Sequence, residues 1–231
     1  MASMKLELRV PYYVHPPQSR RPILLFLHGI GEGFVNKSQS GHDNALRQGP
    51  PKHLETLGPN HPLLNLFTLI VPQLPDRQTL WDAVVDDLHA ILAPYRSADA
   101  RLYLVGFSKG GLGAFQVAGR LGAAALVTID ASPMDLPARD ALARRVNLAR
   151  QPPFWAIYTS YTQNEDFWKI QEFNELLTDQ VHSGLDVMPA VGRKIRTLEE
   201  APPGMAPVAR HVWLCDQVSA CAAPYEWLLR H

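Results

Sequence analysis

The sequence predicts an α/β fold, a mostly parallel sheet with helices on both faces, and three observations favour it. Short apolar runs of strand length alternate with segments of helical periodicity along the chain. Most of these runs are wholly apolar, as strands that are buried on both faces of a parallel sheet are. The length of 231 residues suits one domain with a sizeable core, so residues 1–231 are expected to form a single domain.

The expected strands differ in their polarity patterns. The first, Lys5 to Val10, alternates polar and apolar residues, which is typical of an edge strand. The last, Lys194 to Leu198, is a weaker candidate. The strands between them are apolar throughout and are predicted to be central: Ile23 to Leu27, Phe67 to Val71, Leu102 to Val105, Ala124 to Ile129 and Phe154 to Tyr158.

The expected helices lie between these strands. Leu80 to Tyr95 has apolar residues at helical spacing, and Pro224 to Leu229 begins with proline, which is favoured in a first turn. Only one short helix fits between Asp130 and Phe154, so we expect an open pocket without a large cap domain. The other expected helices are Gly110 to Leu121 and Trp168 to Val181, and the expected loops are Asn36 to Pro62 and Ala201 to Pro207.

Composition excludes several classes of protein. The 22 basic and 22 acidic residues give a net charge of zero, so a nucleic-acid partner is not expected. No segment is long and apolar enough for a membrane span, and Met1 to Val10 lacks the apolar core of a signal peptide. Cys215 and Cys221 are too few for a disulfide framework and are expected to be reduced thiols. These features favour a cytoplasmic protein.

The segment Gly106-Phe107-Ser108-Lys109-Gly110 carries the strongest functional signal. It stands between an apolar strand and a helix that is rich in small residues. A serine on such a sharp strand–turn–helix connection is held in strained geometry with its hydroxyl above the sheet edge. The flanking glycines are expected because a β-carbon would collide where strand and helix cross. The pattern predicts a nucleophile elbow with Ser108 as nucleophile.

A serine nucleophile needs a base, and histidine is the residue type suited to that role. Position removes most of the nine histidines, because they lie in early loops, on a helix or at the last residue. His182 and His211 remain. His211 follows the last expected strand and precedes the closing helix, so it is the predicted base, on a loop close to Ser108.

The acid that orients the base is expected between Ser108 and His211 in the chain. Glu165 and Asp166 lie in the loop after the strand Phe154 to Tyr158. Asp166 is preferred because it directly precedes a helix, although a helix N-cap role would suit it equally. Glu165 is an alternative acid, and Asp130, at the end of the previous strand, is another.

Acyl transfer also needs hydrogen-bond donors for the developing oxyanion. The backbone amide of Lys109, directly after the nucleophile, is one expected donor. The second is expected from the glycine-rich loop His28-Gly29-Ile30-Gly31, from the amide of Ile30 or of Gly29.

These motifs also resemble those of known proteins. The chain is similar over nearly its whole length to α/β-hydrolase serine esterases of the phospholipase/carboxylesterase-like, dienelactone-hydrolase-like and "predicted peptidase" groups. The residue before the catalytic histidine is usually glycine in these groups, where this chain has Arg210. The similar segments are Pro22 to Glu32, Gln48 to Lys52, Val71 to Pro75, Arg101 to Gly113 and His211 to Trp213 with Pro224 to Leu229.

The resemblance implies an α/β-hydrolase domain with little or no cap, Ser108 as nucleophile, His211 as base and an acid after Tyr158. The expected activity is hydrolysis of small to medium carboxylic esters, thioesters or lactones through an acyl-enzyme, with no metal or organic cofactor. Acyl transfer to an acceptor other than water would use the same residues. The alternative hypothesis is a non-catalytic protein of this fold that binds a small molecule or a partner protein.

Overall fold

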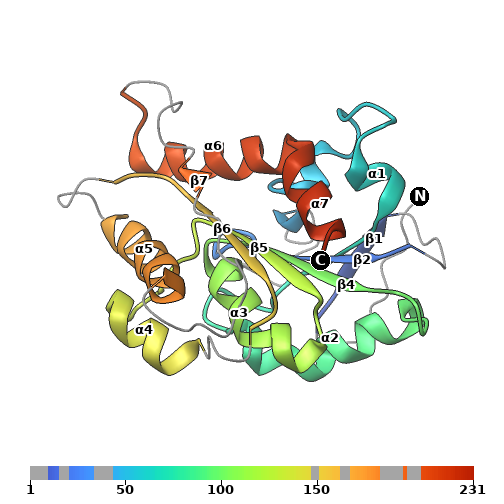
Figure 1. Ribbon diagram of the computed structural model, residues 1–231, viewed down its shortest axis with the longest axis horizontal. Helices are drawn as coiled ribbons and strands as arrows, with labels where there is room; N and C mark the ends of the chain where they lie inside the picture. Colours follow the sequence, from blue (N-terminus) through green and yellow to red (C-terminus); the bar gives the residue numbers. More distant parts are fainter. Residues whose placement is uncertain are drawn as a thin grey trace.

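The structure, a computed structural model, describes residues 10–15, 21–33, 44–146, 151–161, 167–182, 195–196 and 204–231. Its centre is a seven-stranded sheet in the order β1-β3-β2-β4-β5-β6-β7, which runs through the middle of Figure 1. β1 pairs with β3 in antiparallel orientation, and every other neighbouring pair is parallel. The strands are Tyr12–His15 (β1), Ile23–Leu27 (β2), Thr68–Pro72 (β3), Leu102–Phe107 (β4), Ala125–Ile129 (β5), Phe154–Tyr158 (β6) and Ile195–Arg196 (β7).

Helices cover both faces of this sheet. In Figure 1, α2, α3 and α4 lie below the sheet with α5 beside α4, whereas α1, α6 and α7 lie above it. The α-helices are Pro62–Leu66 (α1), Val85–Leu92 (α2), Lys109–Leu121 (α3), Ala138–Arg145 (α4), Trp168–His182 (α5), Pro207–Ala220 (α6) and Ala222–Leu229 (α7). Short 3₁₀ helices are Asn44–Leu46 (η2), Pro50–His53 (η3), Trp81–Val84 (η4) and Ala93–Tyr95 (η5).

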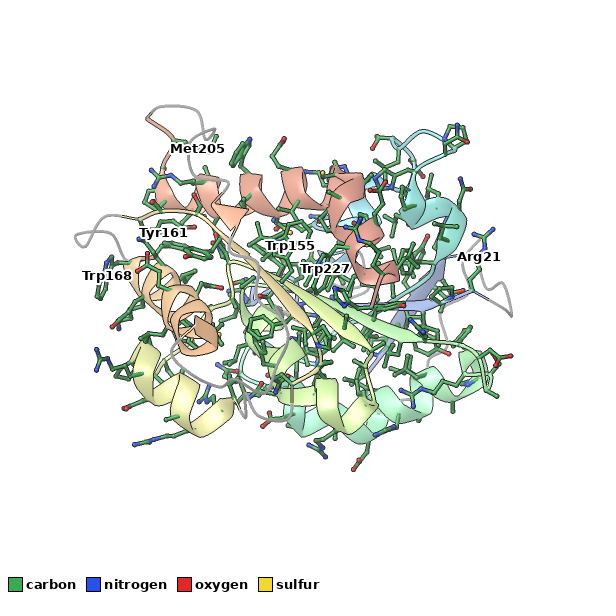
Figure 2. The ribbon with its side chains drawn as sticks, in the orientation of Figure 1. Arg21, Trp155, Tyr161, Trp168, Met205 and Trp227 are labelled. Atoms are coloured by element: carbon green, nitrogen blue, oxygen red, sulfur yellow. The ribbon has the colours of Figure 1, made fainter. Side chains whose placement is uncertain are left out.

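Two apolar cores separate the helices from the sheet, one on each face. Leu25 of β2 belongs to the core between the sheet and α2 to α5, and its neighbour Phe26 belongs to the core between the sheet and α1, α6 and α7. Successive side chains of a strand point to opposite faces, which is why a sheet covered on both sides needs wholly apolar strands. Trp155 of β6 and Trp227 of α7, both labelled in Figure 2, meet in the second core with ring centroids 5.8 Å apart.

The predicted fold class is confirmed, and so are the central strands to within two residues at each end. The expected edge strand, Lys5 to Val10, lies outside the described residues except for Val10, and the antiparallel edge strand that the structure describes is β1. Of Lys194 to Leu198, the described part is β7. Between β5 and β6 the described residues form one helix, α4, which agrees with the expected absence of a large cap.

Helix α6 is the main element that the sequence did not predict. His211 was expected to lie on a loop, and it belongs instead to a helix of 14 residues, Pro207–Ala220. Pro207 occupies its first turn, where a missing N–H costs no hydrogen bond. Leu214, Cys215 and Val218 pack into the core above the sheet. None of the helices that the structure describes combines the length and apolar composition that a bilayer-spanning helix needs.

Candidate active site

Ser108 stands at a sharp turn between β4 and α3. Its backbone has φ 54° and ψ −118°, a conformation that residues other than glycine rarely adopt. The two flanking glycines are required by the crossing of strand and helix. A β-carbon on Gly106 would collide with the carbonyl of Gly110, and one on Gly110 would collide with the carbonyl of Leu27. The local geometry is therefore that of a nucleophile elbow.

The backbone of Ser108 is tied to the neighbouring strand as well as to its own helix. Its N–H donates to the carbonyl of Ile129, the last residue of β5, at 2.9 Å. Its carbonyl accepts from the amides of Gly111 and Ser132, each at 2.9 Å. These bonds hold the elbow against the carboxyl end of β5, where Asp130 follows directly.

Asp130 is fully buried and has three hydrogen-bond donors around its carboxylate. Oδ1 accepts from the backbone amide of Thr159 at 2.8 Å. Oδ2 accepts from the hydroxyl of Tyr161 at 2.7 Å and lies 2.9 Å from Nδ1 of His211. The backbone of Asp130 also has a positive φ of 45°. A carboxylate held from three sides in this way has one available orientation.

His211 lies in the second turn of α6, with 7% of its surface exposed. Its ring packs against those of Phe107 and Phe167, with centroids 4.5 Å and 5.1 Å away. The preceding residue, Arg210, donates to the carbonyls of Ser160 at 2.7 Å and Met205 at 3.1 Å, which anchors the start of α6.

Figure 2 places Tyr161 between α5 and the start of α6. In the groups that the sequence resembles, glycine usually precedes the catalytic histidine. Here Arg210 takes that place within helix α6, and a position inside a helix does not require glycine.

Among the described residues, Asp130 is the acid that lies against His211. Asp166 and Glu165 fall outside the described residues, whereas Asp130, the third candidate, makes the contact. The side chain of His182, the alternative base, also lies outside the described part. Since β5 and the elbow strand are neighbours in the sheet, their carboxyl ends bring Asp130 and Ser108 close together.

The glycine-rich loop after β2 is fixed by the buried ring of His28. A neutral imidazole has one donor and one acceptor, and here both are used. Nδ1–H donates to the carbonyl of Gly29 at 2.7 Å, and Nε2 accepts from the amide of Leu74 at 3.0 Å. Burial lowers the pKa of His28 to about 4, so the ring is neutral at pH 7. Gln73 adds a second bond, from Nε2 to the carbonyl of Glu32 at 2.8 Å.

The two predicted oxyanion donors belong to the start of α3 and to the loop after β2. Lys109 is the first residue of α3, so its amide has no partner within the helix. Its side chain is buried and donates to the carbonyl of Arg77 at 2.7 Å. Burial lowers the pKa of Lys109, and the charge of Asp76 partly offsets that effect. Ile30 is 45% exposed and lines the same cavity as Ser108.

A cavity of about 610 Å³ lies next to the elbow. Ser108 and His211 both line it, from the elbow and from α6. Glu32 and Gln48 add polar groups to its wall. Among the described residues no group of three or more histidine, cysteine, aspartate or glutamate side chains is placed to hold a metal ion. The apolar lining includes Ile30, Phe107, Met134, Phe167, Val208 and Val212.

The fold itself is found in many solved structures. XC6422 from Xanthomonas campestris, an α/β serine hydrolase without a lid, matches with a TM-score of 0.57 and 12% identity over 99% of this chain and 94% of that one. Est1E from Butyrivibrio proteoclasticus matches with a TM-score of 0.58 and 13% identity over 99% and 98% of the two chains. The chain has the α/β-hydrolase fold.

A carboxylesterase from Nitrososphaera gargenis shares the α/β-hydrolase fold as well, with a TM-score of 0.57 and 12% identity over 100% of this chain and 97% of that one. By sequence, no protein-family model and no curated protein matches the chain. At these identities the similarity supports the fold alone.

Two site residues were not singled out from the sequence. Tyr161 is buried, and its hydroxyl donates to Oδ2 of Asp130. Glu32 was treated only as the end of a similar segment, and it lines the cavity. Its position a few residues after a central strand, in the loop expected to carry an oxyanion donor, was the available signal.

Proposed function

We propose that the protein is a serine hydrolase that cleaves small to medium carboxylic esters through an acyl-enzyme on Ser108. The observation that carries this proposal is the buried bond between Asp130 and His211 at the wall of the cavity that Ser108 also lines. Nucleophile, base and orienting acid are the three roles that acyl transfer by serine requires.

In this scheme Asp130 sets the tautomer of the base. An ionised carboxylate only accepts hydrogen bonds, so Nδ1 of His211 carries the proton and Nε2 is left free to accept one. Nε2 removes the proton of Ser108 as its Oγ attacks the ester carbonyl. The resulting imidazolium is stabilised by Asp130, and it then protonates the leaving alcohol.

The negative charge that develops on the carbonyl oxygen is stabilised by backbone amides. Lys109 provides one, and Ile30 provides the other, with Gly29 as the alternative donor. A water molecule, deprotonated by His211, then attacks the acyl-enzyme and releases the carboxylic acid. No step of this scheme uses a metal ion or an organic cofactor.

The size and lining of the cavity support esters as the substrate class. A volume of about 610 Å³ is within the range of small-molecule sites. Its apolar residues suit a short or medium acyl chain, and Ile30 and Val208 lie exposed on its wall.

The proposal is tested with 4-nitrophenyl esters from acetate to octanoate, assayed with the wild type and with Ser108→Ala. We expect turnover by the wild type and a loss of at least about 10³-fold in kcat for the variant, because the nucleophile is absent. Ser219→Ala is the matched control, since this buried serine of α6 does not line the cavity. Equal turnover by the wild type and Ser108→Ala would contradict the proposal.

A further inference from the structure

The carboxylate of Glu32 lies beside the nucleophile. A β-carbon built on Gly29 would be 2.9 Å from Oε2 of Glu32 and 3.3 Å from Cβ of Ser108. Oε2 of Glu32 and Cβ of Ser108 are therefore separated by no more than the sum of these two distances. Glu32 is 7% exposed and lines the cavity, so its carboxylate stands within reach of a substrate bound to Ser108.

This carboxylate lacks a cation among the described residues. Its Oε2 is buried and has no hydrogen-bond partner there. The closest basic atom is Nδ1 of His28 at 4.0 Å, but that nitrogen uses its proton for the carbonyl of Gly29. Burial raises the pKa of Glu32, and this effect is opposed by the amides of Glu32 and Gly29 and by the charges of His211 and Arg77. None of these groups forms an ion pair with it.

Gln48 supplies a second acceptor without a donor. Its Oε1 is buried, has no hydrogen-bond partner among the described residues, and belongs to a side chain on the wall of the same cavity. Buried polar atoms are almost always hydrogen-bonded, so two unpaired acceptors in one cavity indicate a ligand that brings donors. An ammonium group has three donors and no acceptor, and it carries the charge that Glu32 lacks.

The remaining charges of the cavity wall lie in exposed positions. Lys169 and Asp135 are both exposed, and Asp135 is already paired with Arg145 at 3.3 Å. Most other lining residues are apolar. A cationic group that enters this cavity is therefore most strongly attracted to the Glu32 carboxylate, where the low dielectric strengthens the attraction.

We propose that Glu32, assisted by Gln48, binds a primary ammonium group on the acyl part of the substrate, next to the scissile carbonyl. The natural substrates are then esters of amino acids or of similar short amino-substituted acids. This inference rests on the proposed ester hydrolysis at Ser108, and it adds a charge-selecting subsite to it. Because Glu32 Oε2 lies close to Ser108, an ammonium group bound there must be close to the carbonyl carbon that Ser108 attacks.

The test compares two activated esters of nearly the same shape. The 4-nitrophenyl ester of alanine carries an ammonium group where 4-nitrophenyl isobutyrate carries a methyl group. Glu32→Gln removes the charge and keeps the shape of the side chain. We expect this variant to lower kcat/KM for the alanine ester by about 10- to 100-fold, the worth of one charge-assisted hydrogen bond, mainly through KM. Because 4-nitrophenyl isobutyrate has no ammonium group, kcat/KM for it should fall by a clearly smaller factor than kcat/KM for the alanine ester.

Gln48→Leu and Asp135→Asn complete the design. Gln48→Leu should lower kcat/KM for the alanine ester by a smaller factor than Glu32→Gln does. Asp135→Asn removes one negative charge from the exposed wall of the same cavity, and it should leave the ratio of the two esters within about twofold because an exposed charge is screened.

Equal losses for both esters in Glu32→Gln, or no loss for either, would overturn the ammonium site while ester hydrolysis stands. If the wild type hydrolyses neither ester and Ser108 is not acylated, the proposed function falls and this inference falls with it. Isobutyrate turnover by Glu32→Gln also reports that the variant is folded.

Discussion

Two buried carboxylates lie near Ser108, and their surroundings are opposite. Asp130, directly after β5, has donors from Thr159, Tyr161 and His211. Glu32, in the loop after β2, has a buried oxygen with no hydrogen-bond partner among the described residues. A buried carboxylate that is fully bonded is fixed in place, whereas one with a buried, unbonded oxygen keeps bonding capacity for a ligand.

The difference indicates two separate roles in one cavity. Asp130 acts through another residue: it holds the His211 ring and stabilises its charged form. Glu32 has no such partner to position, and it lines the cavity that the substrate is proposed to fill. Each of the following predictions alters one of the two regions and leaves the other intact.

The largest effect is expected from Asp130→Asn. The amide would place an N–H group against Nδ1 of His211 and favour the wrong tautomer, so kcat on an activated ester should fall by about 10³- to 10⁴-fold. Steady-state kinetics measure this. The control is Asp216→Asn, the same change on α6 at a residue paired with Lys52, which should retain turnover. Comparable turnover by Asp130→Asn and the wild type would remove Asp130 from the catalytic scheme.

His28, whose ring fixes the loop that carries Glu32, should make the folded protein less stable at acidic pH. Its pKa is lowered from 6.5 to about 4 by burial, so on acidification the unfolded chain takes up a proton before the folded chain does. Stability contributed by the neutral ring is present above pH 6.5 and is lost as the pH falls toward 4, with a loss of about 3 kcal/mol.

Urea unfolding at a series of pH values measures this effect. His28→Gln should be less stable at pH 7 but should lack this component of the acid dependence. Because His53 and His61 also have lowered pKa values, the difference between wild type and variant isolates His28. Parallel curves for the two proteins would show that the ring does not carry the effect.

A smaller effect is expected when the Asp130 region loses one of its donors. Tyr161→Phe removes the hydroxyl that donates to Oδ2, and kcat should fall by about 3- to 10-fold, the worth of one hydrogen bond. Tyr225→Phe is the matched control, since its buried hydroxyl donates to the carbonyl of Ser219 at 2.8 Å, away from the cavity. The control should lose stability and keep kcat. An equal loss of kcat in both variants would contradict a specific role for Tyr161.

The smallest effect is expected on the pH dependence of stability, because ionising the buried Glu32 without a bound ligand costs free energy. Burial raises its pKa, so its contribution to stability is present below the unfolded pKa and is lost as the pH rises through the folded one. Glu32→Gln should therefore gain stability relative to the wild type as the pH rises, measured by thermal unfolding. A constant difference across pH would show that Glu32 is already compensated.

The sequence was sufficient for the elements whose signals are local. The central strands were predictable because a strand buried on both faces must be apolar throughout. The elbow was predictable because Gly106 and Gly110 are the residues that its crossing geometry tolerates. The fold class follows from those features, and so does the position of Ser108.

The acid and the helix of His211 depend on contacts between distant segments. Asp166 was preferred from its place after β6, and it lies outside the described residues, whereas the neighbour relation of β4 and β5 brings Asp130 to the elbow. Helix α6 begins in a region with many prolines, and it is stabilised by packing on the sheet rather than by a strong local pattern. The absence of a hydrogen-bond partner for Glu32 Oε2 among the described residues depends on what surrounds it in three dimensions, which its place in the chain does not specify.

The most direct measurement is covalent labelling of the protein by a fluorophosphonate, followed by mass spectrometry of its peptides. The account predicts that the label is found on Ser108, that Ser108→Ala takes up none, and that Asp130→Asn reacts far more slowly than the wild type. Labelling of a different residue, or an unchanged rate in Asp130→Asn, would contradict it.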